Sequence, residues 1–448
     1  MPNGRLDKVG GVASKQRLYR ERERDDRMFR LMLGLLAASL AGLFQTASAL
    51  DLRLVSFASP PLIAEVQLLR LNENLRQAMA TGDFVGLAVA VVRDGEVRLL
   101  QTYGETETGT GELVTPDTVF RIASLSKGFA SSMVGLAVSE GRLSLDERVG
   151  GFAPELALPG GGEKKLTLSD LLSQRTGLPP NAYDNLLEEG VAPVNILPMF
   201  RKVKPACPVS DCYTYQNITY DLAGRALAKA YDESYSYLVE ARLFAPLGME
   251  TASYGFQGLS HTGNWARPHM RERQKDPVLP PHPWTPLEVK LPYYATPAAG
   301  GVNASIRDMA TWLNAQLGHA PDVLPPDVLD LIHLPLVATP SETRRMRDAM
   351  PALTASHYAF GWRVYDYAGH TVVAHGGSVD GYGAQIMFLP DEDTGIVILS
   401  NARSRRMWAI APMFMDLTLG LPPKDWLALG DPDPASPGAD QGAAKAAE

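Results

Sequence analysis

The sequence predicts an α+β fold in which strands from both ends of the chain form one antiparallel sheet, flanked by helices, with an all-α region between. Residues 84–104 (FVGLAVAVVRDGEVRLLQTYG) indicate two apolar strands joined at Asp94-Gly95, a dipeptide typical of two-residue hairpin turns. Residues 383–390 and 394–401 repeat this pattern around an acidic turn. The chain between the two hairpins is instead rich in helical patterns. We therefore expect the two chain ends to meet in one sheet.

Helices are predicted where apolar residues recur every three or four positions. Glu65–Met79 (EVQLLRLNENLRQAM) has this spacing and predicts an amphipathic helix. Further helices are expected over the stretches 125–141, 216–231, 304–317 and, after the second hairpin, 407–421. Gly-Gly and Pro-Pro pairs separate these segments and indicate loops.

Composition and charge exclude several classes of protein. The 448 residues are 45% hydrophobic and 21% charged, which is typical of a globular protein. Nine of the 42 basic and five of the 50 acidic residues lie in residues 1–49, so the remainder carries a net charge of −12. Such an acidic body repels phosphate backbones, and no nucleic-acid partner is expected. Two cysteines exclude a disulfide-rich scaffold and a zinc site made of cysteines.

The N-terminal region resembles a leader for export. Leu31–Phe44 is a run of 14 uncharged residues, and Ala47-Ser48-Ala49 follows it. A helix of that length spans roughly 21 Å, which is short of the roughly 30 Å hydrocarbon core of a bilayer. The pattern therefore predicts a signal peptide cleaved after Ala49 and a periplasmic or secreted protein. An uncleaved N-terminal anchor is the alternative, and it is the only membrane association expected.

The sequence predicts four segments in the chain, and the leader is the first of them. Residues 1–49 are the leader and signal peptide, with Met28 as an alternative start because Met28-Phe29-Arg30 makes a compact basic n-region. A linker is predicted over 50–64, one enzyme domain over 65–426, and a disordered low-complexity tail over 430–448. The sequence does not predict the oligomeric state.

Export would place the two cysteines, Cys207 and Cys212, in an oxidising compartment. Thiols separated by four residues can close a small loop in an oxidising compartment. We expect this disulfide, and two unpaired thiols are the alternative. Because the loop is short, its effect on stability should fall below the roughly 3 kcal/mol expected for a 15-residue loop.

The clearest chemical signal is Ser124-Leu125-Ser126-Lys127, which holds the only Ser-x-x-Lys of the chain. It opens a predicted apolar helix, so the first serine and the lysine share one helical face. A buried lysine shifts towards the neutral amine, which can accept the proton of a serine nucleophile. A capping serine beside an exposed lysine is the alternative for the motif taken alone.

Two further motifs occur twice each. Tyr-x-Asn is found at Tyr183 and at Tyr215-Gln216-Asn217, and His-x-Gly at His261 and at His375-Gly376-Gly377. Tyr215 opens a predicted helix, whereas Tyr183 follows a Pro-Pro loop. His375 follows the strand-like HTVVA and precedes the last hairpin. Together with the order of blocks in the resemblance described next, these positions select Tyr215 and His375, and His261 is expected to be structural or exposed.

These motifs resemble those of the serine β-lactamase and penicillin-binding-protein superfamily, especially its class C-like branch. The similarity covers roughly residues 65–426 and includes, in order, TPDTVFRIASLSKGF, GRLSLDERVGGFAPEL, LTLSDLLSQRTGLPP, YTYQNITYDLAGRAL, TPAAGGVNASIRDMATWL, YAFGW and AHGGSVDGYGAQIMFLPDEDTGIVILSNA. So many blocks in the same order are not expected by chance. The resemblance implies a β-lactamase/transpeptidase-like fold.

The resemblance also implies a role for each residue of the site. Ser124 would attack the acyl carbon, and Lys127 and Tyr215 would exchange protons with it. Asn217 would bind the substrate amide and hold the lysine. The strand residues that would line the substrate are His375, Gly376, Gly377 and Ser378. Backbone N–H groups of Ser124 and Ser378 would form the oxyanion hole. No metal and no cofactor is implied.

One departure from the family pattern bears on the substrate. The β-lactamases of this branch usually carry Lys-Thr-Gly where this chain has His375-Gly376-Gly377. Histidine is mostly neutral at pH 7, and glycine has no hydroxyl to hold the carboxylate of a β-lactam. We therefore expect a serine hydrolase that cleaves an amide or ester of a small molecule or peptide, such as a D-amino-acyl peptide. A class C-like β-lactamase and a non-catalytic penicillin-binding sensor are the alternatives.

Overall fold

The computed structural model describes residues 60–275 and 279–430, with side chains from residue 65 onward. The predicted leader with its cleavage point after Ala49, and the tail beyond residue 430, lie outside the described residues. The first described helix, α2, spans Pro60–Ala80 and begins within the segment predicted as a linker. Among the described residues, no helix is both long and apolar enough to cross a bilayer.

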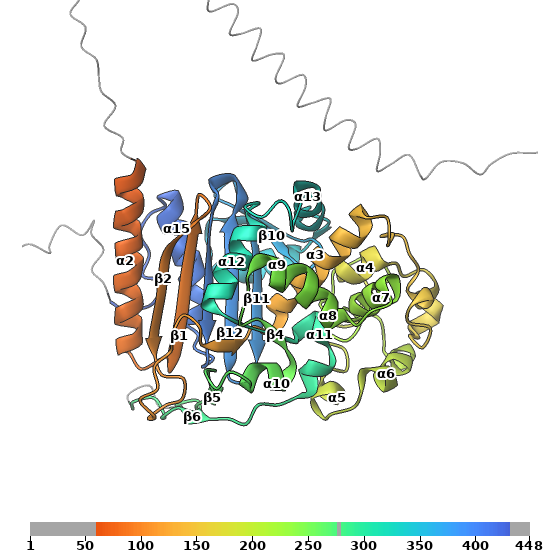
Figure 1. Ribbon diagram of the computed structural model, residues 1–448, viewed down its shortest axis with the longest axis horizontal. Coiled ribbons are helices and arrows are strands. Elements are labelled where there is room, and N and C mark those ends of the chain that lie inside the picture. Colours follow the sequence, from red (N-terminus) through yellow and green to blue (C-terminus); the bar gives the residue numbers. More distant parts are fainter. Residues whose placement is uncertain (1–59, 276–278, 431–448) are drawn as a thin grey trace, which may run out of the picture. The chain divides into compact units, whose positions relative to one another are not determined.

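The main sheet has eight antiparallel strands in the order β2-β1-β13-β12-β11-β10-β9-β8 (Figure 1). The strands are β1 Gly86–Arg93, β2 Glu96–Gly104, β8 Val337–Ala338, β9 Leu353–Tyr358, β10 Arg363–Tyr367, β11 His370–Val379, β12 Tyr382–Leu389 and β13 Thr394–Ser400. Strand β1 pairs with β13. The prediction that both chain ends meet in one sheet is therefore confirmed.

The turn between β1 and β2 explains why this hairpin could be found in the sequence. Asp94 and Gly95 have φ values of 52° and 76°, which are both in the left-handed region. A two-residue hairpin turn of this type requires positive φ at both positions, and Asp-Gly accommodates it well.

Two smaller sheets lie beside the main one. The first, in the order β3-β7-β4, carries the chain into the region of Ser124. The second is the hairpin β5-β6. Their bounds are β3 Val119–Arg121, β4 Ser253–Tyr254, β5 His269–Met270, β6 Thr285–Pro286 and β7 Val302–Ser305.

The remaining helices lie mainly between β2 and β9 in the sequence. They are α3 Ser126–Ser139, α4 Leu168–Leu172, α5 Asp184–Glu188, α6 Pro193–Ile196, α7 Leu222–Tyr231, α8 Tyr235–Val239, α9 Ala245–Leu247, α10 Gly255–Ser260, α11 Pro297–Gly300, α12 Ile306–Gln316, α13 Pro326–His333, α14 Pro340–Met346 and α15 Met407–Leu419. Short 3₁₀ or π turns are η1 Ala123–Leu125, η2 Val149–Gly151, η3 Pro159–Lys164, η4 Leu197–Lys202, η5 Glu240–Phe244, η6 Pro292–Ala295 and η7 Pro390–Glu392.

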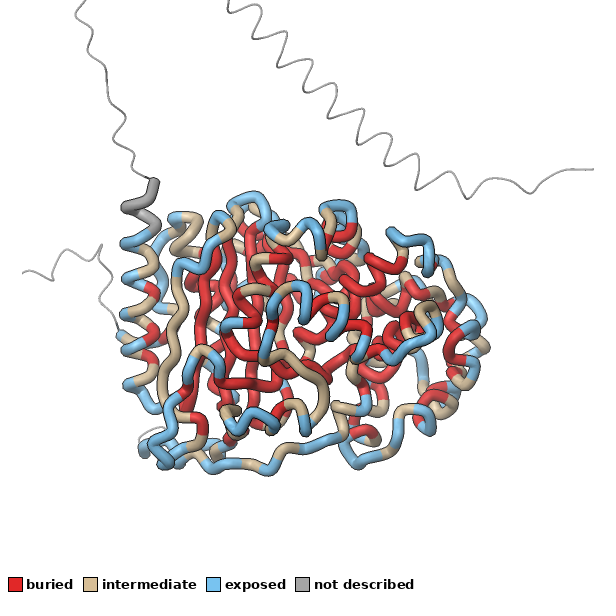
Figure 2. The backbone as a smooth tube through the Cα atoms, viewed as in Figure 1, coloured by how far each residue is buried: buried red, intermediate tan, exposed pale blue. Residues whose placement is uncertain are grey.

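Helices cover both faces of the sheet. Alternate residues of β1 enter two different cores: Leu87 and Val89 pack with α2 and α15, whereas Ala88 and Ala90 pack with α3 and α12. Strands β12 and β13 are buried along their whole length (Figure 2). Figure 1 shows α2 next to β2 at one side of the view and α4 to α7 at the other.

Two features of the structure differ from the prediction in ways that affect the site. Helix α7 begins at Leu222 rather than at residue 216. The residues before it form turns that hold Asn217 and Asp221 against Lys127 and α11 instead of continuing the helix. Strands β8, β9 and β10, which continue the sheet beyond β11, were not predicted.

Candidate active site

Ser124 lies on η1, directly before the buried helix α3. It is partly exposed, whereas Ser126 and Lys127 are fully buried. Ala123 has a φ of 48°, a left-handed conformation that is costly for a residue with a side chain. Ser126 stabilises this segment, because its hydroxyl donates to the Ala123 carbonyl at 2.6 Å and accepts the Val302 N–H at 3.0 Å. The backbone is thus held in a strained form that presents Ser124.

Three polar groups surround the Lys127 amine. Its Nζ lies 2.8 Å from Asn217 Oδ1, 2.9 Å from the Ala299 carbonyl and 3.3 Å from Ser124 Oγ. The first two can only accept hydrogen bonds, so they take two N–H groups of the amine. Asn217 Nδ2 donates to Asp184 Oδ2 at 2.7 Å, which fixes the orientation of the amide. The third hydrogen-bonding position on the Lys127 amine therefore points at the Ser124 hydroxyl.

Burial lowers the pKa of Lys127 to about 7. The carboxylates of Asp184 and Asp221 oppose this shift, and the Arg363 guanidinium adds to it. A neutral amine donates two hydrogen bonds and keeps one lone pair. With Asn217 and Ala299 taking the two N–H groups, that lone pair faces Ser124 Oγ and can accept its proton.

Tyr215 and Asn217 are positioned by the side chain of Gln174. Its amide accepts the backbone N–H of Gln216 at 2.7 Å and donates to the Gln216 carbonyl at 3.0 Å. The Tyr215 carbonyl also accepts the Asn181 N–H at 2.8 Å. Contacts from Gln174 and from Asn181 thus fix the turn that contains Tyr215 and Asn217, although neither residue belongs to a helix or a strand.

The structure brings Tyr215 to both members of the Ser-x-x-Lys motif. Interaction with the Ser124 side chain lowers the pKa of its hydroxyl and partly opposes the effect of burial. The Lys127 Nζ lies 4.7 Å from the centre of its ring. Burial raises the pKa of Tyr215 to about 12, so the phenol keeps its proton at neutral pH. Lys127 and Tyr215 therefore differ in protonation: one is suited to accept a proton, and the other to donate one.

Strand β11 forms the opposite wall of the site. It pairs with β12 as far as Val379, but with β10 only as far as Ala374. From His375 onward, one edge of β11 therefore has no strand partner. A Cβ added at Gly377 would lie 2.3 Å from the Ile122 carbonyl and 3.2 Å from the Ser124 nitrogen. Glycine at this position allows the free edge to approach the nucleophile, and exposed Ser378 follows it.

His375 lies inside the site rather than at its surface, with a relative exposure of 2%. Burial, together with the positive charges of Arg363 and Lys127, lowers its pKa well below the usual value. Its Nε2 lies 3.4 Å from the Tyr358 hydroxyl. The imidazole is therefore neutral, and it supplies no cation at neutral pH.

Comparison with known proteins identifies the fold and the family. The family model described as Beta-lactamase matches residues 71–419. The chain belongs to the beta-lactamase family. Two solved structures share its fold: an octameric penicillin-binding protein homologue from Pyrococcus abyssi (TM-score 0.68, 23% identity, 79% of this chain and 78% of that one) and a class C beta-lactamase mutant (TM-score 0.62, 19% identity, 78% and 97%). The predicted β-lactamase/transpeptidase-like fold is thereby confirmed.

Two curated relatives are matched over about three quarters of this chain but over a smaller share of their own length. The unguisins hydrolase ungD' of Aspergillus campestris is 25% identical over 346 residues, which are 73% of this chain and 60% of that protein. Protein flp of Staphylococcus aureus is 24% identical over 330 residues, 72% of this chain and 61% of that protein. The chain thus spans about three fifths of the length of either relative.

Sequence reasoning missed three charged residues around this beta-lactamase-family site. Asp184 holds Asn217, and Asp221 accepts the Ala298 N–H at 2.8 Å, which fixes the loop carrying the Ala299 carbonyl. Burial raises the pKa of both carboxyls, that of Asp221 to about 7. Arg363, from β10, forms an ion pair with Glu342 and lies 6.0 Å from the Tyr215 ring centre. Asp184 lies in the first Tyr-x-Asn, and Asp221 lies in the block YTYQNITYDLAGRAL, but neither position indicated a role in the site.

The structure also places the two motif copies that were not selected, at Tyr183 and His261, and the two cysteines. Tyr183 stacks on Phe200 at 5.5 Å between ring centres, and His261 is exposed after α10. Cys207 and Cys212 form a disulfide three residues before Tyr215. Their loop packs on Gly177, whose carbonyl accepts the Ala206 N–H at 2.9 Å. Among the residues described, no group of three or more His, Cys, Asp or Glu side chains could hold a metal ion.

The close approach at Gly377 predicts a specific sensitivity. Gly377→Ala should lower kcat/KM about 100-fold, because the new Cβ meets backbone atoms that cannot turn aside, and a shift of about 1 Å costs that much. Gly376→Ala is the matched control, since its Cβ meets only the Trp408 ring at 3.0 Å, and its loss should be smaller. Ester kinetics and thermal unfolding of both variants check this. A greater loss in Gly376→Ala would contradict it.

Proposed function

We propose that this protein is an exported serine hydrolase that cleaves an amide or ester through an acyl-enzyme on Ser124. One observation carries the proposal: two acceptors occupy the N–H groups of Lys127, so its lone pair faces Ser124 Oγ. The lowered pKa of Lys127 fits the same role. The name of the relative ungD', a hydrolase, also supports hydrolytic chemistry.

In acylation, Lys127 Nζ takes the Ser124 proton while Oγ bonds to the acyl carbon and its carbonyl becomes an oxyanion. Backbone N–H groups of Ser124 and Ser378 would stabilise that oxyanion, which is usually a large catalytic contribution. As the tetrahedral intermediate collapses, the bond to the leaving group breaks. Tyr215 gives the leaving atom its proton, and the Lys127 ammonium restores the proton of the phenol.

In deacylation, water replaces the leaving group. Lys127 takes a proton from the water as its oxygen bonds to the acyl carbon, and the bond to Ser124 Oγ then breaks with return of a proton to Oγ. Because Tyr215 donates to the leaving group, that group lies on the Tyr215 side. The acyl chain then extends the other way, along the free edge of β11 towards Ser378. A peptide-like acyl chain can hydrogen-bond to such an edge.

The state of His375 favours esters or peptides over β-lactams as substrates. A neutral, buried imidazole supplies no cation to pair with the carboxylate of a β-lactam, and hydrogen bonds between charged groups contribute roughly 1.5–3 kcal/mol. A class C-like β-lactamase remains the second candidate, because the fold and the Ser124 geometry are shared. A non-catalytic penicillin-binding sensor is the third.

A side-by-side hydrolysis screen separates these three functions. The panel holds a chromogenic cephalosporin, p-nitrophenyl esters and D-alanyl peptides. We expect uncharged p-nitrophenyl esters to give a higher kcat/KM than the cephalosporin, by about tenfold or more, because they have no carboxylate that needs a cationic partner. A cephalosporin that is the best substrate would establish the β-lactamase. Covalent labelling of Ser124 with no product from any substrate would establish the sensor.

Export is a separate part of the proposal. It is supported by the uncharged run Leu31–Phe44 followed by Ala47-Ser48-Ala49. N-terminal sequencing of protein from the periplasmic fraction or the medium should begin at Leu50. Recovery of the intact leader in membranes would replace cleavage with anchoring.

A further inference from the structure

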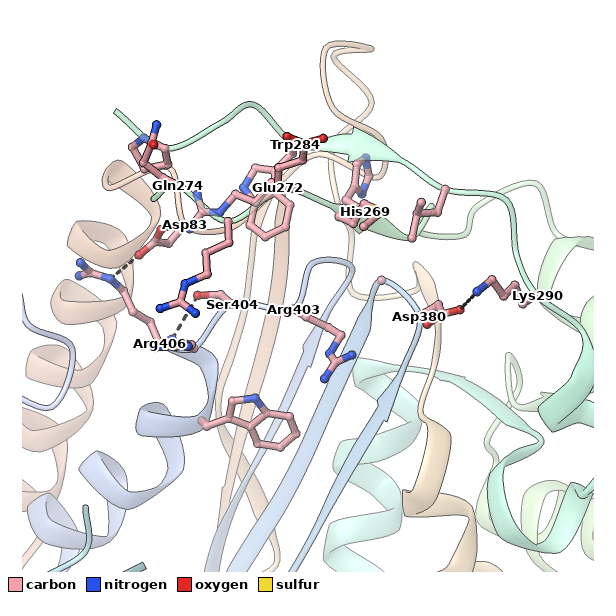
Figure 3. Close-up of a pocket in the computed structure, with 18 of the residues that line it drawn as sticks. Asp83, His269, Glu272, Gln274, Trp284, Lys290, Asp380, Arg403, Ser404 and Arg406 are labelled. Carbon is pink, nitrogen blue, oxygen red and sulfur yellow. Dashed lines mark hydrogen bonds and ion pairs between the residues drawn. The ribbon is translucent and has the colours of Figure 1, made fainter. Parts of the chain in front are cut away.

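Two cavities of similar size differ in their relation to the site. One, of about 980 Å³, lies beyond the β11–β12 turn, and the described residues that line it, such as Arg403 and Asp380, do not belong to the group around Ser124 (Figure 3). The other, of about 920 Å³, is lined by Tyr215 and by the three residues before it, which begin at Cys212. The chain at Tyr215 therefore has open space on one side, and packing there does not restrain it.

Tyr215 also lacks the support of regular secondary structure. Residues 203–221, all of which are described, form neither a helix nor a strand. Loops of more than about 12–15 residues without secondary structure are uncommon in compact domains, and those that are ordered commonly carry function. The position of the phenol must therefore be set by other contacts of this segment.

The other side of the segment packs on residues 174–181, which are described and likewise form no helix or strand. The Ser210 N–H donates to the Arg175 carbonyl at 2.9 Å, and the Thr214 N–H to the Gln174 carbonyl at 2.8 Å. Gln174 and Ser210 have φ values of 62° and 73°, in the left-handed region. Such residues cost roughly 1–3 kcal/mol each and persist only where surrounding contacts hold them. The two strained loops therefore depend on restraints beyond these hydrogen bonds.

The Cys207–Cys212 disulfide supplies a covalent restraint at this point. Cys207 is packed on Gly177, where an added Cβ would lie 2.4 Å from the Cys207 carbonyl oxygen. Cys212 lines the cavity and lies three residues before Tyr215. The bond thus joins the end of the loop that is packed to the end that faces open space. Because the loop is short, the bond contributes little to the stability of the whole fold, and its restraint is local.

We propose that Cys207 and Cys212, through their disulfide, are positioning residues for Tyr215 and keep its phenol where it can protonate the leaving group. The proposal rests on the hydrolase function above, in which Tyr215 gives the leaving atom its proton. Lys127 depends less on the disulfide, because it lies on α3 and donates to the Ala299 carbonyl. Loss of the disulfide should therefore weaken protonation of the leaving group more than activation of the serine.

Two esters with the same acyl group test the proposal. p-Nitrophenolate leaves as a stable anion, whereas the alkoxide of an ethyl ester must be protonated as it leaves. In Cys207→Ser/Cys212→Ser, the ratio of kcat/KM for ethyl butanoate over p-nitrophenyl butanoate should fall about tenfold, which is part of the roughly 10²–10⁴-fold contribution of a general acid. Tyr215→Phe should lower the same ratio further. Acid release in a pH-stat measures both esters.

Leu75→Ala is the matched control for a loss of stability. Leu75 is fully buried on α2, in the core on the other side of the sheet, so its truncation should cost about 2–5 kcal/mol. Its melting temperature should fall while its ratio of ethyl to p-nitrophenyl ester equals that of the wild type. If the double cysteine variant does not fold, the wild type is reduced with dithiothreitol until both thiols can be counted, and its ratio should fall in the same way.

Three results would overturn the proposal. The first is an unchanged ratio in the protein without the disulfide. The second is an equal fall in Leu75→Ala. The third is a fall that Tyr215→Phe does not share, because the disulfide would then act on another group.

Hydrogen exchange separates this proposal from the hydrolase function. The Thr214 and Gln216 N–H groups both donate to Gln174, so a peptide over residues 213–217 should exchange slowly in the wild type. It should exchange faster in Cys207→Ser/Cys212→Ser, while a peptide over β12 is unchanged. Equal exchange over residues 213–217 would overturn the positioning role even if hydrolysis is demonstrated. Faster exchange without turnover of any ester would reject only the hydrolase.

Discussion

Ser124→Ala is expected to abolish covalent labelling by a fluorescent penicillin or fluorophosphonate and to lower kcat/KM on the order of 10⁶-fold, as removal of a serine nucleophile does elsewhere. The chain holds no second Ser-x-x-Lys to replace it. Gel fluorescence after labelling and single-turnover kinetics with a p-nitrophenyl ester measure the two effects.

The fold should survive this change. Ser124 is partly exposed, and within the described part of the chain its hydroxyl interacts with Lys127 and Tyr215. Lys127 keeps its bonds to Asn217 and Ala299 in the variant. The melting temperature should therefore match or exceed that of the wild type, since active sites commonly sacrifice stability for function.

Ser126→Ala is the matched control two residues away. It leaves the buried Val302 N–H without its acceptor, which costs about 1–3 kcal/mol of folding free energy. This variant should unfold at lower temperature yet still be labelled at Ser124. Full activity in Ser124→Ala, or loss of labelling only in Ser126→Ala, would refute the assignment of the nucleophile.

The part of the site that could be predicted from sequence is the part set by local spacing. Ser124 and Lys127 share one turn of helix, so three residues of separation already place them together. The strand-like segment before His375 and the helix predicted to open at Tyr215 gave a reason to choose these two residues over their duplicates. The structure brings Tyr215 to Ser124 and His375 to within 6.2 Å of the Tyr215 ring centre.

The remaining residues of the site depend on tertiary contacts. Asp184 meets Asn217 from 33 positions away, and Gln174 braces Gln216 from 42. No local pattern marks such pairs. Burial of His375 also was not predictable, because the sequence shows an alternating strand but not which neighbours close over it.

The fold, like the site, has elements that could be predicted from local sequence and elements that could not. Hairpin β1–β2 could be predicted because Asp94-Gly95 marks its turn. Strand β9, LTASHY, mixes apolar and polar residues, and β8 has only two residues. Both depend on pairing with a neighbouring strand more than on their own sequence, so the part of the sheet beyond β11 was missed.

The second large effect concerns Lys127. Lys127→Ala should lower kcat/KM about 10²–10⁴-fold, the usual contribution of a general base. In the wild type, kcat/KM should rise with pH and level off above about 7, because burial lowers the pKa of Lys127 to about 7 and only the neutral amine accepts the serine proton. A pH profile of ester hydrolysis measures this acid limb, which should vanish in Lys127→Ala.

Other titratable groups near Lys127 could also produce an acid limb, and the titration of each must be distinguished from that of Lys127. Tyr215, with a pKa raised to about 12, keeps its proton throughout, so Tyr215→Phe should lower the rate but retain the limb. The pKa of His375 lies well below its usual value, so its titration falls at lower pH. Burial raises the pKa of Asp221 to about 7, but this carboxylate accepts backbone N–H groups of α11 rather than contacting Ser124. A limb that persists in Lys127→Ala would assign it to Asp221 or to Asp184, whose pKa burial also raises.

Two variants that leave Lys127 in place give the sharpest form of this prediction, because they should move the limb in opposite directions. The Asp184 carboxylate stabilises the charged amine, so Asp184→Asn should lower the pKa of Lys127 and shift the limb to lower pH. The Arg363 guanidinium destabilises the charged amine, so its removal should shift the limb to higher pH. Arg363→Gln is combined with Glu342→Gln, because the single change would leave a buried carboxylate without its partner. Damage to the fold would lower the plateau rate in both variants without separating their limbs. Limbs that stay together, or cross in the opposite sense, would remove Lys127 as the base that activates Ser124.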